Sequence, residues 1–220
     1  MAFENWYEPY ERINAYSTIP GSDELLRKVI YYLIDMPTAN HTPFTDNRCP
    51  RVRIAKYLYH DEPRPLDKET PTPQQKLSLI YNPENPPNPP TQKGFRIFPQ
   101  IAITEAQENA QTRLYAFMGF VDPKTVYKSE ISVLFRVLCN TSYDSNSKDG
   151  AASRSWAIVK AIVEALSGVN ISGVGTFYFD RNQNSECAIR YITDDQHNVG
   201  YQLCMGLTFM GDTRENTPTI

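Results

Sequence analysis

Residues 126–139 carry apolar side chains at every second position in their second half, and this stretch constrains the fold more than any other. A period of two is typical of a β-strand that buries one face on a core. The apolar positions of this alternation are Ile131, Val133, Phe135 and Val137. Residues 113–121 predict a second strand, and Asp122-Pro123-Lys124 between the two has turn chemistry. We therefore expect an antiparallel hairpin over residues 112–139.

The other periodic stretches predict two helices and further strands. One helix begins at Ser22 and is stopped by Pro37; the other is capped by Ser153 and ends at Gly168. The further strands are expected at residues 95–103, 175–179, 187–192 and 199–210. Because strands and helices do not alternate along the chain, the order of elements disfavours a doubly wound parallel sheet. We predict an α+β fold, with a mainly antiparallel sheet and two helices packed on one face.

A proline-rich segment separates the first helix from the first strand. The chain has 17 prolines, and ten of them lie between Pro63 and Pro99. Residues 82–90 read NPENPPNPP, which is typical of a stiff polyproline-like conformation. We expect residues 38–94 to be a long Pro-rich insertion, in the form of an extended arm or a long β-hairpin; a loosely ordered surface loop is the alternative. The prolines expected at a subunit or partner interface are Pro86, Pro87, Pro89 and Pro90.

Residues 1–21 are aromatic and show neither a helical nor a strand period. Five large aromatic side chains fall within the first sixteen residues, and terminal segments fray unless they are docked. We expect this arm to pack on its own domain or on a neighbour, through Trp6, Tyr7 and Tyr10. The prediction for the whole chain is an aromatic arm at 1–21, a single α+β domain at 22–211 and a flexible tail at 212–220.

The sequence offers few groups for catalysis. It has three histidines, and no metalloprotease, serine-hydrolase or phosphate-loop motif occurs. Asp194, Asp195 and His197 are metal-ligating types, but they fall at a predicted hairpin tip, where Asp is common because it tolerates turn geometry. The four cysteines form no CxxC pair, so we expect free thiols in a reducing compartment. We expect no enzyme activity, no metal and no cofactor.

One cluster of cations stands out from a chain whose formal net charge is −3. Arg48, Arg51, Arg53 and Lys56 lie within nine residues without an acid among them. We expect this cluster to make ion pairs between subunits or to form a solvated edge; contact with phosphate is the alternative. The chain as a whole lacks the clear excess of positive charge that is normal for a nucleic-acid domain.

Two locations are also disfavoured by the sequence. No apolar run approaches the roughly 20 residues that a bilayer span needs, so we expect no membrane partner. Residues 1–10 contain two acids and no basic region, so we do not expect a secretory signal.

The order of these elements resembles the tail-terminator, or tail-completion, proteins of tailed bacteriophages, and more loosely the head–tail connector proteins around them. The matching parts are the opening helix DELLRKVIYYLI, the strand RIFPQIAI, the long strand TVYKSEISVLFRVLCN, the helix RSWAIVKAIVEALSG, the turn and strand ISGVGTFYFD, and the final strand YQLCMGLTFM. The resemblance covers residues 22–36 and 94–210 and lies in element order and apolar pattern. Residues 38–94 depart from it, because the family has a short linker there.

This resemblance implies a structural virion protein that is assembled in the host cytoplasm. The implied role is a subunit of a ring, commonly a hexamer, that joins the phage tail to the neck and head and surrounds the DNA conduit. The implied partners are further copies of the chain, neighbouring neck, tail-tube or sheath proteins, and DNA that passes through without sequence-specific binding. The competing function is a soluble binding module that holds a small ligand or peptide on an aromatic sheet face.

Overall fold

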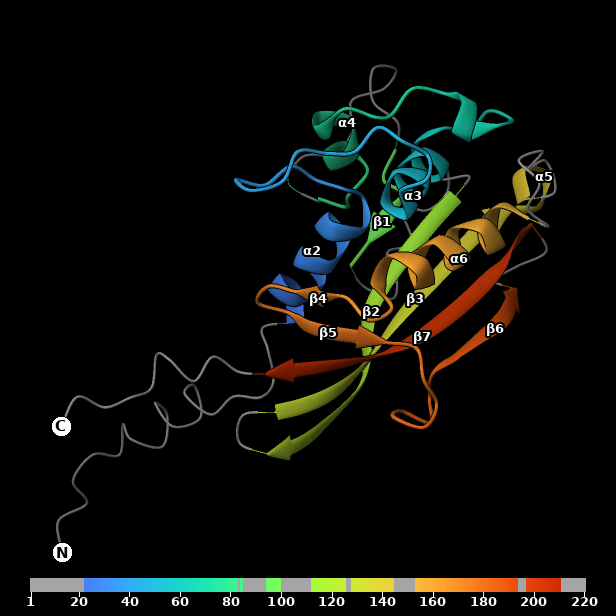
Figure 1. The fold of residues 1–220 in the computed structure, drawn as a ribbon. Coiled ribbons are helices and arrows are strands. Elements are labelled where there is room, and N and C mark those ends of the chain that lie inside the picture. Colours follow the sequence, from blue (N-terminus) through green and yellow to red (C-terminus); the bar gives the residue numbers. More distant parts are fainter. Residues whose placement is uncertain are drawn as a thin grey trace, which may run out of the picture.

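The computed structural model describes residues 22–82, 84, 94–99, 112–125, 128–144, 153–193 and 197–210. Its helices are α2 (Ser22–Leu33), α3 (Pro50–Tyr59), α4 (Pro73–Ser78), α5 (Thr141–Asp144) and α6 (Arg154–Leu166), with a short 3-10 helix η1 (Pro65–Asp67). Its strands are β1 (Ile97–Phe98), β2 (Thr112–Thr125), β3 (Lys128–Asn140), β4 (Asn170–Ile171), β5 (Gly175–Tyr178), β6 (Ala188–Thr193) and β7 (Asn198–Met210). The predicted α+β class is confirmed (Figure 1).

The described strands form one seven-stranded sheet. Its order is β1-β2-β3-β7-β5-β4, and β6 also pairs with β7. The β1–β2 pair is parallel and the other described pairs are antiparallel. Strand β7 is long enough to pair with β6 through residues 199–204 and with β5 through residues 206–208. The sheet is therefore mainly antiparallel, as the sequence predicts.

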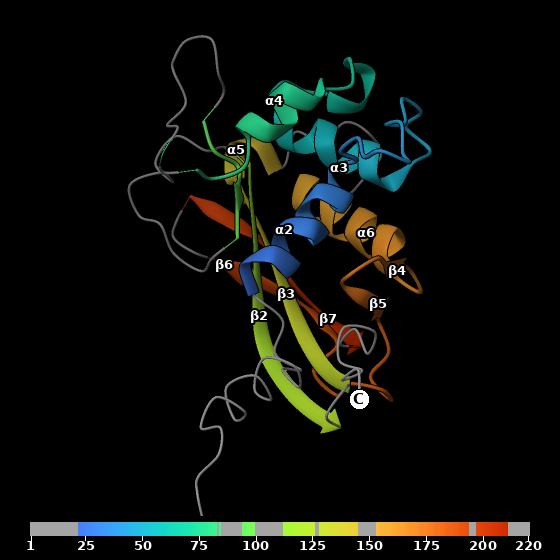
Figure 2. The same ribbon diagram turned by 90° about the vertical axis from the view of Figure 1, so that its left-hand side faces the viewer.

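The predicted hairpin over residues 112–139 is confirmed, but its turn lies further along the chain. Strands β2 and β3 are in antiparallel register as far as the pair Thr125–Lys128, so residues 122–124 belong to β2 and do not form the turn. Pro123 is accommodated because the register shifts between Pro123 and Thr125, at the outer side of the sheet where a strand tolerates proline. The end of this hairpin extends beyond the helices in both ribbon views (Figures 1 and 2).

Helices α2 and α6 cover one face of the sheet, as predicted, and α3 lies beside them (Figure 2). The apolar stripes of α2 and α6 are buried in one core with alternate side chains of β2, β3 and β7. The Ser153 side chain caps α6 by accepting from the backbone N of Trp156 at 3.2 Å. Gly168 has a φ of +76°, the left-handed conformation that ends a helix at glycine.

Helix α3 corrects the prediction for the proline-rich segment. An extended arm or β-hairpin over residues 38–94 is wrong for residues 50–59, because Val52, Ala55 and Leu58 are fully buried on a helix that packs into the main core. The physical reason is that proline is favoured in the first helical turn, where its missing N–H is not needed. Helices α3, η1 and α4 each begin at a proline. These prolines therefore mark helix starts, while residues 83 and 85–93 lie outside the described residues.

The strand predicted at 95–103 is only partly described. Residues 97 and 98 form β1 beside β2, and residues 100–103 lie outside the described part. A second, smaller core lies on the sheet face away from the three helices, and its buried members are Phe95, Phe98, Tyr115 and Leu138. The rings of Phe98 and Tyr115 stack with centroids 5.1 Å apart. Part of the aromatic sheet face is therefore closed by the chain itself.

Candidate functional site

Reactive groups do not converge in the described residues. In that part of the chain, no group of three or more His, Cys, Asp and Glu side chains is placed to hold a metal ion. Asp194 and Asp195 lie outside it, whereas the carbonyl oxygen of His197 accepts from the backbone N of Thr141. All four cysteines are free. Burial raises the pKa of Cys139 to about 12 and that of Cys204 to about 11, so both are protonated, weak nucleophiles at neutral pH.

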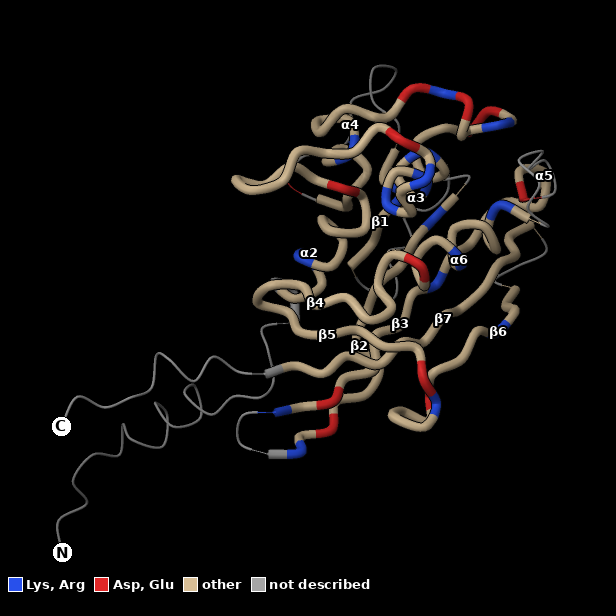
Figure 3. Tube along the Cα trace, viewed as in Figure 1, with Lys and Arg blue, Asp and Glu red and all other residues tan. Residues whose placement is uncertain are grey.

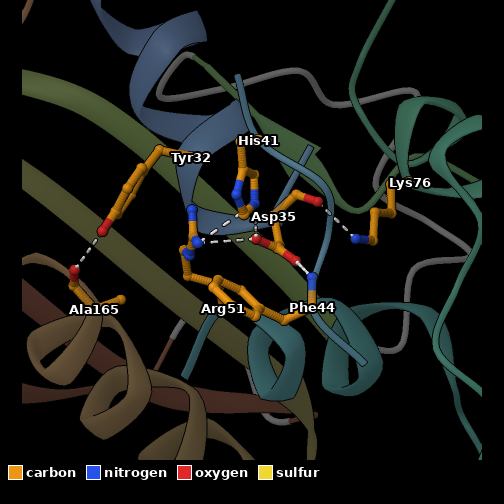
Figure 4. Close-up of polar contacts among 7 residues, drawn as sticks. All are labelled: Tyr32, Asp35, His41, Phe44, Arg51, Lys76 and Ala165. Carbon is orange, nitrogen blue, oxygen red and sulfur yellow. Dashed lines mark hydrogen bonds and ion pairs between the residues drawn. The ribbon is translucent and has the colours of Figure 1, made fainter. Parts of the chain in front are cut away.

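A buried polar site centres on Asp35, just after α2 (Figure 4). Asp35 has a left-handed φ of +56°, and its side chain is fully buried. One carboxylate oxygen lies 2.8 Å from Nε2 of His41 and 3.1 Å from Nη2 of Arg51, and the other accepts from the backbone N of Phe44 at 2.6 Å. The Asp35 carbonyl oxygen accepts from Nζ of Lys76 at 2.8 Å. The site thus joins α2, the loop after it, α3 and α4.

Arg51 extends this site to the helical layer. Its guanidinium carbon lies 4.5 Å from the ring centroid of Tyr32 and 5.2 Å from that of Phe44. The Tyr32 hydroxyl donates to the carbonyl oxygen of Ala165 in α6 at 3.3 Å. A buried carboxylate is tolerated only when charges and donors compensate its lost hydration, and this one has both. We interpret the cluster as an anchor that fixes the loop after α2 against three helices.

Lys76 is the second buried charge of the same anchor. Burial lowers the pKa of Lys76, and the nearby Asp35 carboxylate opposes that shift. Its side chain is 1 % exposed, so its ammonium depends on the Asp35 carbonyl for a partner. Short helix α4, which carries Lys76, is held in place by this contact and by a capping box between Thr72 and Gln75.

Two further arginines tie the end of α3 to the rest of the molecule. Arg154, at the start of α6, donates to the carbonyl oxygens of His60 at 2.9 Å and Glu62 at 3.0 Å. Arg96 forms a two-point pair with Asp61, at 2.9 and 2.8 Å. Both guanidinium groups are almost fully buried. These arginines therefore hold the segment between α3 and η1 against α6 and against the start of β1.

The cations predicted at a subunit interface have partners within the same chain. Arg51 pairs with Asp35, Arg53 donates to Glu164 of α6, and Nζ of Lys56 donates to the carbonyl oxygen of Leu66 at 3.1 Å. Burial lowers the pKa of Lys56. Arg48 is different, because its side chain is 94 % exposed and its contact with Asp46 is 3.6 Å long. Of the four, Arg48 alone keeps its charge fully at the surface.

The remaining predicted interface residues lie outside the described part of the chain. They are Trp6, Tyr7 and Tyr10 of the aromatic arm, and Pro86, Pro87, Pro89 and Pro90 of the proline-rich segment. Their expected role in an interface therefore stays a prediction.

The described sheet ends at β1 and β2 on one side and at β4 and β6 on the other, and the longer edges, β2 and β6, differ in character. Among the described residues, β6 pairs only with β7, without a register shift, and β1 covers β2 only at Leu114 and Tyr115. The uncovered part of β2 has register shifts after Met118 and Pro123, which blunt an edge. Its end also carries mixed charges (Figure 3), where Lys124 contacts Asp122 and lies 3.4 Å from Glu130. Within the part of the chain that the structure describes, β6 is therefore more open than β2 for pairing with another chain.

Aromatic side chains accompany this open edge. Tyr191 of β6 is 61 % exposed, and its ring lies 5.6 Å from that of Tyr201 in β7. The Tyr201 ring in turn lies 5.1 Å from that of Trp156 in α6. We call these three residues the aromatic ladder. The sequence alone does not predict it, because its rings come from three different elements that only the fold brings together.

A groove lies between α2 and the segment after α4. Its volume is about 760 Å³, and its lining residues are Arg27, Ile30, Tyr31, Leu77, Ile80, Tyr81, Asn82 and Pro99. Two of these are tyrosines and one is an arginine that stacks on Tyr31 at 5.1 Å. The groove has room for a small ligand or a short peptide.

Comparison with known families gives one match. The sequence matches the YomW family over residues 52–207, which is more than half of the chain. The chain belongs to the YomW family. The family is phage-derived. The matched span begins within α3 and ends within β7, so α3, η1 and α4 lie inside the family's own region.

The other comparisons add no relatives. No curated protein and no solved structure matches the chain. In the described part of the YomW-family chain, none of the helices has both the length and the apolar character needed to cross a bilayer.

Proposed function

We propose that this YomW-family protein is a structural subunit of the phage particle, with a tail-terminator-like role. In this role, copies of the chain form a ring that joins the tail to the neck and head and surrounds the DNA conduit. The proposal is supported by the phage-derived family and by an element order that resembles tail terminators. The observation that carries it is β6, which pairs only with β7 among the described residues and carries a 61 % exposed Tyr191, because such an edge is normally covered in a working protein.

A ring requires a subunit with two different complementary sides. Head-to-tail contacts between identical subunits close into a ring when the rotation per subunit divides a full turn. The open β6 edge and the charged, blunted end of the β2–β3 hairpin are unlike surfaces, which suits such a contact rather than a two-fold pair. Neck, tail-tube or sheath proteins are then expected on the faces of the ring.

The charge of the chain suits a conduit that lets DNA pass. Its formal net charge is −3, and three of its four clustered cations are engaged within the subunit. Phosphate binding strengthens with each cation that is available to displace counterions. A ring of such subunits would therefore hold DNA weakly.

Immunogold electron microscopy of purified phage particles tests this placement. Antibody against the protein should label intact particles at the junction of head and tail, and particles made without the protein should remain unlabelled and fail to join heads to tails. Absence of the protein from purified, DNA-filled particles would contradict a structural role.

A second candidate function is a soluble module that binds a small ligand or peptide. The groove between α2 and the segment after α4 favours it, because tyrosine, isoleucine and arginine side chains line its volume of about 760 Å³. This function predicts a monomer whose thermal stability rises with a ligand. A screen of peptides and small molecules by thermal shift tests it, with Tyr31→Ser as the variant that should lose the response.

A further inference from the structure

We infer that the outer face of the sheet carries a binding site for an acidic segment of another protein. The outer face is the one away from α2, α3 and α6 (Figure 2). The site consists of Arg113 of β2, Arg136 of β3, Gln202 of β7 and Arg190 of β6, which we call the arginine cluster. The inference goes beyond the ring and does not depend on it, because it concerns the surface of a single subunit.

The register of the sheet brings these four side chains together. Arg136 pairs with Gln202, and Gln202 pairs with Arg190, so the three lie directly opposite one another in neighbouring strands. Tyr115, which pairs with Arg136, belongs to the smaller core on the outer face. Arg113 lies two residues before Tyr115 and so shares that face. Diagonal neighbours such as Arg113 and Arg136 are about 7–8 Å apart.

The charges of the arginine cluster lack counterions in the described part of the chain. Arg113 is only 5 % exposed, and its Nε is buried without a hydrogen-bond partner. Nε of Arg136 is also buried and unpaired, and its Nη2 lies 3.4 Å from Oε1 of Gln202. Arg190 is exposed, and none of the three arginines pairs with a described carboxylate. A buried cation is costly without a counterion, so this arrangement points to an anion that is supplied from outside.

The other buried arginines show how different Arg113 is. Arg96 and Arg154 also have a buried Nε without a partner, but the terminal nitrogens of Arg96 bind a carboxylate, and those of Arg154 bind two carbonyl oxygens. Arg113 has no such partner among the described residues. On the same face, Glu130 lies about 20 Å along β3 from Arg136, too far for an ion pair. Arg113 therefore differs from the arginines that hold the fold together.

The geometry of the cluster favours carboxylate side chains over the phosphates of a nucleic acid. A carboxylate projects from its peptide, so it can reach a recessed guanidinium, which it matches with two parallel hydrogen bonds. Acids two residues apart in an extended segment point the same way and are about 7 Å apart, close to the spacing of Arg113 and Arg136. A nucleic acid would need a broad basic surface, whereas this chain has a formal net charge of −3. The expected occupant is therefore a segment with acids at alternate positions.

Isothermal titration calorimetry with synthetic peptides tests the site on the 220-residue chain. The probe peptide alternates glutamate with serine, and the control peptide has glutamine in place of each glutamate. The wild type should bind the probe and not the control. Arg113→Met and Arg136→Gln should each raise the dissociation constant of the probe about tenfold, because each removes a charge-assisted contact. Arg181→Gln, at an exposed arginine in the turn before β6, is the matched variant and should bind as the wild type does.

The melting temperature of the free protein separates a binding role from a structural role. Arg113→Met should melt at the wild-type temperature or above it, because the buried charge has no described partner to lose. Saturating probe should raise the melting temperature of the wild type, since a ligand that binds only the folded state stabilises it. Arg113→Met should lose most of this rise.

Several outcomes would overturn the inference. They are an absence of probe binding by the wild type, equal binding of the control peptide, and equal weakening by Arg181→Gln. A free Arg113→Met protein that is unfolded, or that loses as much stability as Arg154→Met, would show that Arg113 supports the fold; Arg136→Gln then still reports whether the probe binds at this face. Tighter binding of a duplex DNA than of the probe would overturn the choice of an acidic segment. These outcomes leave the proposed ring untouched, because none of them measures assembly.

Discussion

Replacement of Asp35 by asparagine is the sharpest test of how the helical layer is held. Asparagine keeps the size of the side chain, tolerates the left-handed φ of +56°, and retains an oxygen for the backbone N of Phe44. It removes the charge that faces Arg51 at 3.1 Å, where the arginine side chain is only 14 % exposed. Breaking a buried pair costs about 3–5 kcal/mol, because the remaining charge stays buried without its partner.

The partial exposure of Arg51 favours the lower end of that range, about 3 kcal/mol. For a chain of this size, a loss of 3 kcal/mol lowers the melting temperature by roughly 6–12 °C. Thermal unfolding followed by circular dichroism measures this change. Asp46→Asn is the matched control, because Asp46 and Arg48 are 62 % and 94 % exposed and lie 3.6 Å apart. That control should change stability by less than about 0.5 kcal/mol. Equal shifts in the two variants would refute the interpretation of Asp35 as a buried anchor.

Three further variants or reactions test other parts of the structure. Gly200→Ala should lower the free energy of unfolding by about 3 kcal/mol in chemical denaturation, because the added Cβ would meet the backbone of β3. The control Gly94→Ala adds a Cβ that meets no atom and should change this free energy by less than about 0.5 kcal/mol. Equal effects of the two variants would contradict the close approach of β7 to β3. Arg154→Met should cost about 2–3 kcal/mol by the same measurement, since two buried carbonyl contacts lose their donor, and Lys160→Met on the exposed side of α6 should be near neutral. At pH 8, a thiol reagent should leave Cys139 unmodified until the protein unfolds, because a pKa raised from 9.0 to about 12 lowers the thiolate fraction about a thousandfold. Mass spectrometry measures the labelling. Rapid labelling of the native protein would contradict the burial of this thiol.

The parts of the fold that sequence predicts are those set by local periodicity. The hairpin of β2 and β3 and the helix capped by Ser153 follow from spacing alone, because one buried face repeats along each element. Helix α3 was missed although its signal is local. Pro50 occupies the first turn, and Val52, Ala55 and Leu58 recur at helical spacing. The many prolines nearby favour an interpretation as an extended arm, because proline is common both in the first turn of a helix and in an extended segment.

The partners of buried charges could not be predicted, since they depend on tertiary contacts. Lys76 meets the carbonyl of Asp35, 41 positions earlier, and Arg154 meets carbonyls 94 and 92 positions earlier. The sequence identifies the cationic cluster, but not the ion pair of Arg51 with Asp35, because a loop separates the two residues along the chain. Charge alone identifies a residue that needs a partner, and only the folded chain shows which partner it has.

The native mass of the purified 220-residue chain tests the central claim most directly. Sedimentation equilibrium should give a closed oligomer, a fixed multiple of 25.2 kDa that does not grow further with concentration. Negative-stain images of the same sample should show rings with a central opening. A species of 25.2 kDa at every concentration, with no larger form, would contradict the account of this protein as a ring subunit.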